Sequence, residues 1–123
     1  MPPAVAEYKA AVEMASQNPS LAHFLTPVLK RLLEVQVALA RSHWLASRAD
    51  SGLAACTDAL ATTEKLKDSE PVADCAADLK VQQARCLLAL GRKAEGEELM
   101  RRTLAAQPGT EYWQDGLLTV RGT

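Results

Sequence analysis

Residues 84–108 read ARCLLALGRKAEGEELMRRTLAAQP, and their spacing predicts two helices joined by a tight turn. The small Ala84 is followed seven residues later by Gly91, which favours a left-handed cap at the end of a first helix. Gly96 lies in the next helical segment, which Pro108 ends because proline cannot continue a helix. Glycine inside a helix costs about 1 kcal/mol relative to alanine, so we expect Gly96 where two helices pass close together.

The same spacing occurs once more upstream. Residues 40–64 read ARSHWLASRADSGLAACTDALATTE, and they align with residues 84–108 at a constant shift of 44 positions (40 to 84, 52 to 96 and 60 to 104). Self-similarity at a fixed period is the signature of repeat architectures, in which each unit buries a face against its neighbour. The sequence therefore predicts two stacked helical hairpins, with Gly52 and Gly96 at equivalent close crossings.

These positions resemble the tetratricopeptide repeat (TPR) consensus over about residues 33–108. The second unit matches at Ala84, Leu87, Gly91, Gly96, Met100, Thr103, Leu104 and Pro108, and the first at Ala40, His43, Ser47, Gly52, Cys56, Ala59 and Leu60. The resemblance implies a short right-handed superhelix of antiparallel helix pairs, each pair consisting of a helix A and a helix B. The alternative is an unrelated helical bundle with coincidental alanine and glycine spacing.

Some positions depart from the TPR pattern. Gln36 and Lys80 stand where a large apolar residue is expected near the start of helix A, and Glu64 replaces the terminal proline of the first unit. A TPR is about 34 residues long. Longer helices and the connector at residues 67–71 explain the larger period of this chain.

Prolines and glycines divide the whole chain into about six predicted helices. The predicted helices span about 3–18, 27–47, 50–66, 71–90, 93–106 and 110–120, with Pro3, Pro27 and Pro71 in opening turns and Thr26 and Asp50 as N-caps. The fold class is all-α, in a single domain over residues 1–123. It comprises a flanking helix (3–18), repeat 1 (about 27–67), repeat 2 (about 71–108) and a C-terminal capping helix (about 110–120).

Composition argues against several classes of protein. The net charge of −1 disfavours nucleic-acid binding, which needs a basic stripe to neutralise phosphates. No apolar run approaches the ~18 residues of a membrane-spanning helix, so membrane insertion is not expected. The three cysteines, Cys56, Cys75 and Cys86, are an odd number, which favours free thiols in a reducing, cytoplasmic compartment.

The sequence lacks patterns typical of catalysis or of metal and cofactor binding. There are two histidines. His43 occupies a helix-A contact position and His23 lies in a connector, so neither is expected to activate a nucleophile. His43 and Cys56 can approach each other across the first hairpin, but two ligands fall short of a metal site. No glycine-rich phosphate loop occurs. We therefore expect no catalytic residue, no metal and no cofactor.

The TPR resemblance implies a concave groove lined by the A helices, which binds a peptide or a partner helix. Transferred position by position, the groove residues are Glu34, Val37, Arg41, Trp44 and Leu45 in the first repeat, Asp78, Val81, Gln82, Arg85 and Leu88 in the second, and Tyr112 if the last helix acts as a third helix A. Arg41 and Arg85 share one repeat position, and two guanidinium groups side by side suit a carboxylate or a peptide carbonyl.

Two alternatives stay open for these groove residues. The arginines can form intramolecular ion pairs with Glu34 and Asp78, and Trp44 can be either an apolar anchor or buried under the N-terminal helices. The Asn and Lys with which chaperone-binding family members clamp a C-terminal carboxylate are absent, since Val37 and Arg41 stand at those positions.

These features favour a non-enzymatic protein–protein interaction module, an adaptor or scaffold subunit of a larger complex. One alternative is a small TPR-type chaperone for a secretion or assembly client, and a remote one is an enzyme or an enzyme accessory domain. The expected partner is another protein or peptide. Trp113, Leu117 and Leu118 in the last predicted helix also offer a surface for self-association.

Overall fold

The structure is a computed structural model that describes residues 3–106, and within this range every regular element is a helix. In chain order the elements are α1 (Pro3–Gln17), the 3₁₀-helix η1 (Pro19–Phe24), α2 (Leu25–Leu45), α3 (Ala49–Leu66), α4 (Ala73–Ala89) and α5 (Lys93–Ala106). The all-α class is confirmed. The described range holds five α-helices where about six were predicted for the chain, and the predicted helix at 110–120 lies outside it.

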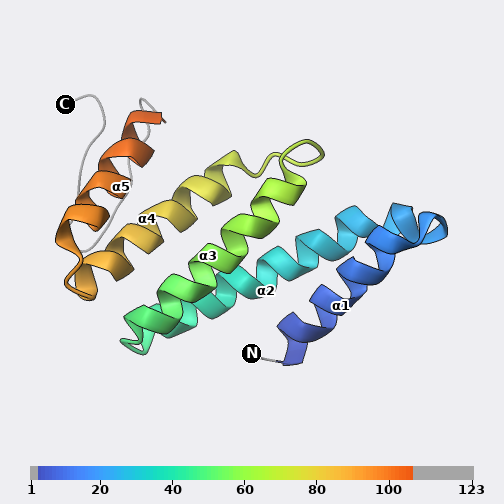
Figure 1. The fold of residues 1–123 in the computed structure, drawn as a ribbon, viewed down its shortest axis with the longest axis horizontal. Helices are drawn as coiled ribbons and strands as arrows, with labels where there is room; N and C mark the ends of the chain where they lie inside the picture. Colours follow the sequence, from blue (N-terminus) through green and yellow to red (C-terminus); the bar gives the residue numbers. More distant parts are fainter. Residues whose placement is uncertain (1–2, 107–123) are drawn as a thin grey trace.

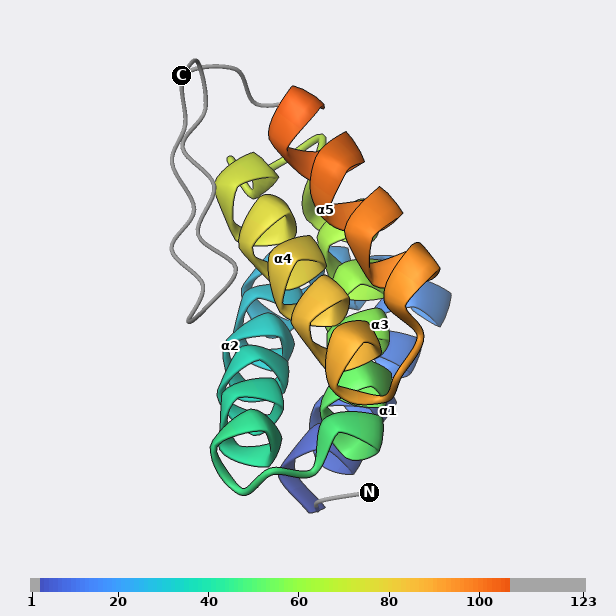
Figure 2. The ribbon, with the colours of Figure 1, turned by 90° about the vertical axis from the view of Figure 1, so that its left-hand side faces the viewer.

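Helices that follow one another in sequence also pack against one another. They run in alternating directions, so that α2 with α3 and α4 with α5 form two antiparallel hairpins (Figure 1). Seen from the side, α2 and α4 lie to the left of α3 and α5 (Figure 2). No described helix is both long enough and apolar enough to cross a membrane.

The close helix crossing predicted from glycine is confirmed at Gly96, whereas the tightest contact at Gly52 is with α4 of the other hairpin. A Cβ atom added at Gly96 of α5 would lie 2.8 Å from Cγ of Leu88 and 3.0 Å from the carbonyl oxygen of Ala84, both on α4. A Cβ atom added at Gly52 of α3 would lie 3.7 Å from Cβ of His43 on α2. Gly96 therefore lies where a larger side chain would force α4 and α5 apart, whereas at Gly52 the contact with α2 is an ordinary van der Waals distance and the nearest atom is Sγ of Cys86 on α4, at 3.2 Å.

The two hairpins turn in the same way at positions 44 residues apart. Ser47 and Gly91 both have a left-handed backbone, with φ of 60° and 82°. The amide N–H of the following residue donates to a carbonyl five residues back in each case, Arg48 to His43 and Arg92 to Leu87, both at 2.9 Å. These bonds satisfy carbonyl groups that a helix end leaves unpaired. The left-handed cap predicted at Gly91 is confirmed.

Two predicted N-caps are wrong. Thr26 lies inside α2, because η1 runs directly into that helix and Phe24 becomes its N-cap, without a side-chain bond. Asp50 lies in the first turn of α3, whose N-cap is Arg48, and its carboxylate accepts a hydrogen bond from the N–H of the adjacent residue. The predicted start of the helix at Pro71 is shifted as well, since α4 begins two residues later, at Ala73.

A buried polar network joins the first three helices. The Gln36 side chain is only 1% exposed. Its carbonyl oxygen accepts a hydrogen bond from the Thr62 hydroxyl (2.7 Å), and its amide donates to the Asp58 carboxylate (3.2 Å). Lys9 of α1 forms an ion pair with Asp58 at 2.8 Å. Gln36 is thus satisfied in the core, which explains how a polar residue replaces the expected apolar one.

Candidate functional site

A hollow of about 280 Å³ opens between α2 and α4, the first helices of the two hairpins. We call it the α2/α4 groove. Its lining consists of Val37, Ala40 and Arg41 from α2 and of Cys75, Asp78, Leu79 and Gln82 from α4. On α4 these residues follow one another at helical spacing, so they form one stripe along the helix. The groove has room for a bulky side chain of a ligand.

The groove combines an apolar floor with charged walls. Ala40 and Leu79 are buried, whereas Arg41 and Asp78 are exposed on opposite helices. Within residues 3–106, no ion pair joins Arg41 or Asp78 to any other side chain. Desolvation, and then the carboxylate of Asp74, raise the pKa of Asp78 above its usual value. A cation and a carboxylate therefore face the hollow without an ion-pair partner in the described part of the chain, where they can bind polar groups of a ligand.

Trp44 and Arg85 connect the two helices beside this groove. The guanidinium carbon of Arg85 on α4 lies 4.5 Å from the ring centroid of the half-buried Trp44 on α2. A cation over an indole face at this distance is attracted by the ring quadrupole, by about 0.5–1 kcal/mol at an exposed site. Arg85 is thus held by Trp44, and it does not line the hollow with Arg41.

The structure brings together four of the predicted groove residues. Val37, Arg41, Asp78 and Gln82 all line the α2/α4 groove. Glu34 is exposed and forms an ion pair with Arg31 (3.6 Å). Leu45, at the end of α2, is 76% exposed and does not line the groove. Tyr112 lies outside the described residues.

Two further predicted groove residues face α5 instead. Val81 is buried in a cluster with Met100 and Leu104, and Leu88 packs against Gly96. The stripe on α4 that contacts α5 therefore runs from Ala77 through Val81 and Ala84 to Leu88, while the groove stripe is rotated from it. Ala40, Cys75 and Leu79 line the groove and were not predicted as groove residues. The only sequence signal for the two α4 residues is that Cys75 precedes Asp78 by one helical turn.

The cysteines are positioned for packing. Cys56 and Cys86 are fully buried, on α3 and α4. Burial raises the pKa of Cys56 to about 12, and the neighbouring Cys86 adds to this effect. A thiol with so high a pKa has almost no reactive thiolate at neutral pH. Among the described residues, no group of three His, Cys, Asp or Glu side chains is arranged to hold a metal ion.

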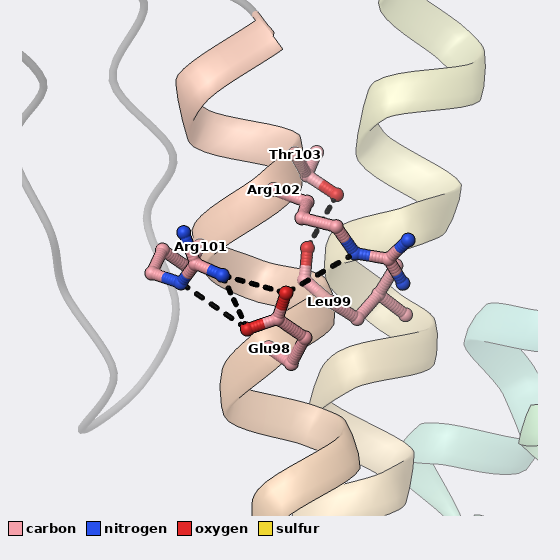
Figure 3. A network of polar contacts seen from close by, with 5 residues as sticks. All are labelled: Glu98, Leu99, Arg101, Arg102 and Thr103. Atoms are coloured by element: carbon pink, nitrogen blue, oxygen red, sulfur yellow. Dashed lines mark hydrogen bonds and ion pairs between the residues drawn. The ribbon is translucent and has the colours of Figure 1, made fainter.

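The outer face of α5 offers a contrast with the groove, because its charged side chains pair with one another. Arg101 binds both carboxylate oxygens of Glu98, and Nε of Arg102 lies 3.7 Å from the same carboxylate (Figure 3). The Thr103 hydroxyl donates to the carbonyl oxygen of Leu99 at 2.8 Å. The hydrogen bond from Arg101 lowers the pKa of Glu98. This surface already has its partners within the helix.

Comparisons with family models, with curated proteins and with solved structures find no match for this chain.

Proposed function

We propose that the chain is a non-enzymatic protein–protein interaction module of TPR type, which binds a segment of a partner protein in the α2/α4 groove. The observation that carries the proposal is that this groove lies between the first helices of two hairpins with equivalent turns. Helical repeats stack equivalent elements into an extended concave surface, and they use this surface for binding.

The groove favours a partner of defined chemistry. Its floor suits a bulky apolar side chain, and Arg41 on one wall suits a carboxylate, which a planar guanidinium can bind with two hydrogen bonds. On the other wall, Asp78 suits a hydrogen-bond donor. The preferred ligand is therefore a peptide or helix with an apolar residue between a carboxylate and a donor group.

The experiment is co-purification of the tagged full chain with its partner from the native source, followed by affinity measurement with the isolated partner. Arg41→Glu replaces attraction by repulsion and is expected to weaken binding about tenfold or more, equivalent to about 1.4 kcal/mol. Arg101→Glu makes the same charge change on the outer face of α5 and serves as the matched control. Equal affinity of the Arg41→Glu variant and the wild type would exclude the groove as the binding site.

A further inference from the structure

The end of α5 lies near the end of α4 that borders the α2/α4 groove. Ala106, the last residue of α5, lines a hollow of about 440 Å³ together with Ala73, the first residue of α4. Cys75, two residues after Ala73, lines the α2/α4 groove on another side of the same helix end. A helix with its side chains is about 10–12 Å across, and three to four extended residues span this distance. The chain beyond Ala106 is therefore long enough to reach the groove.

The sequence of that segment has the chemistry that the groove selects. Residues 110–120 read TEYWQDGLLTV. Bulky apolar residues alternate there with two carboxylates, Glu111 and Asp115, which flank Tyr112 and Trp113. The apolar side chains match the floor of the groove, and the carboxylates match Arg41 on its wall, which forms no ion pair within residues 3–106. Gln114 and the Trp113 indole supply donors for Asp78.

We propose that residues 110–120 bind in the α2/α4 groove of their own chain. A segment tethered by a short linker acts at an effective concentration of about 1 mM, so even an intrinsic dissociation constant of about 0.1 mM leaves it roughly 90% bound. Occupancy by this segment needs no partner. A partner that binds the same groove, as proposed above, competes with the segment. Its affinity is therefore lower for the full chain than for a chain without residues 110–120.

The native thiol of Cys75 reports directly on groove occupancy. Cys75 is half-buried and lines the groove, whereas Cys56 and Cys86 are fully buried and stay unreactive while the chain is folded. In the full chain, the rate of Cys75 modification by a thiol reagent measures how often the groove is open. Variants of residues 110–120 keep the charges of the groove itself, so their rates compare at one fixed pH, whereas Arg41→Glu also changes the field at the thiol and is compared only with variants that carry the same substitution.

The main test is to weaken the contact between residues 110–120 and the groove. The variant W113S/L117S/L118S removes its apolar side chains and is expected to raise the rate of Cys75 modification about tenfold, equivalent to about 1.4 kcal/mol. The control Q114A/T119S changes polar residues of the same segment and is expected to leave the rate near that of the wild type. Equal rates in the wild type and in W113S/L117S/L118S, with both chains folded by circular dichroism, would overturn the proposal.

A charge swap tests the proposed contact between Arg41 and the carboxylates of Glu111 and Asp115. Adding Glu111→Arg with Asp115→Arg to the Arg41→Glu variant is expected to slow Cys75 modification. If the added substitutions did not slow the modification, the proposed pairing of these charges would be contradicted.

Light scattering across dilution identifies the donor chain. Protection that is lost together with a dimeric mass would mean that the segment comes from a second copy, and it would overturn the intramolecular arrangement. Since these measurements use no partner, they stand or fall separately from the proposed function.

Discussion

Substitution of Gly96 by alanine tests the close crossing of α4 and α5. The added methyl carbon would lie 2.8 Å from Cγ of Leu88 and 3.0 Å from the carbonyl oxygen of Ala84. Leu88 can change rotamer, but the backbone oxygen cannot move unless α4 itself moves. Overpacking of this kind costs about 1–3 kcal/mol, and alanine returns about 1 kcal/mol of helix propensity. We expect a net destabilisation of about 1 kcal/mol, which lowers Tm by about 4 °C in a chain of this size.

The assay is urea unfolding followed by far-UV circular dichroism, with Gly52→Ala as the matched control. At Gly52 the nearest atom to an added Cβ is Sγ of Cys86 at 3.2 Å, a side-chain atom that can shift slightly. We therefore expect the crowding cost and the gain in helix propensity to nearly cancel there. If Gly96→Ala raised the unfolding free energy by the full ~1 kcal/mol of helix propensity, the crossing at residue 96 would not be close, and the reasoning would be refuted.

Three further predictions concern stability. Ser47→Gly is expected to raise the unfolding free energy by about 1 kcal/mol, because glycine adopts a left-handed backbone without the cost that other residues incur; an unchanged urea midpoint would contradict that conformation at residue 47. Thr62→Val leaves the Gln36 carbonyl oxygen without its donor and is expected to cost about 1–3 kcal/mol in urea unfolding, whereas adding Gln36→Leu should recover much of this loss; no recovery would count against the network. The pKa of Cys56 is about 12 in the folded chain and near 9.0 when exposed, so the folded state keeps a proton that the unfolded state releases. The unfolding free energy should therefore fall as pH rises from about 9 to 12, by up to about 1.4 kcal/mol per unit, and Cys56→Ala should flatten this dependence.

The hairpins were predictable because their signals are local. Gly91 and Gly96 have backbone roles that a single residue type reveals, and the shift of 44 positions extends the role of Gly91 to Ser47. Helix starts were less predictable, because a cap depends on the chain before it. Thr26 has the right chemistry for an N-cap, but the preceding 3₁₀-helix continues straight into α2.

The groove was only partly predictable, because repeat equivalence transfers positions but not the rotation of each helix. Val37 lines the groove, whereas its equivalent Val81 packs against α5, which covers that side of α4. The partner of Arg85 was not predicted either. Its contact with Trp44 joins residues 41 positions apart (44 to 85), and spacing along one helix does not reveal such a contact.

The polar network around Gln36 shows the same limit. The sequence marks Gln36 as a departure from an apolar position, but its partners Thr62 and Asp58 come from the next helix, and Lys9 comes from α1. Only packing of the three helices brings these groups together. A buried polar group without its partner lowers stability. Because Lys9 of α1 must lie within reach of Asp58, the network restricts how α1 can pack on the first hairpin.

Site-specific photo-crosslinking in extracts of the native source tests whether the α2/α4 groove binds another protein. A photoreactive amino acid replaces Gln82, which lines the α2/α4 groove, or Arg101, which lies on the outer face of α5. We expect a defined covalent adduct with a second protein from position 82 and none from position 101. Adducts of equal yield at both positions, or an adduct from position 101 alone, would contradict this expectation.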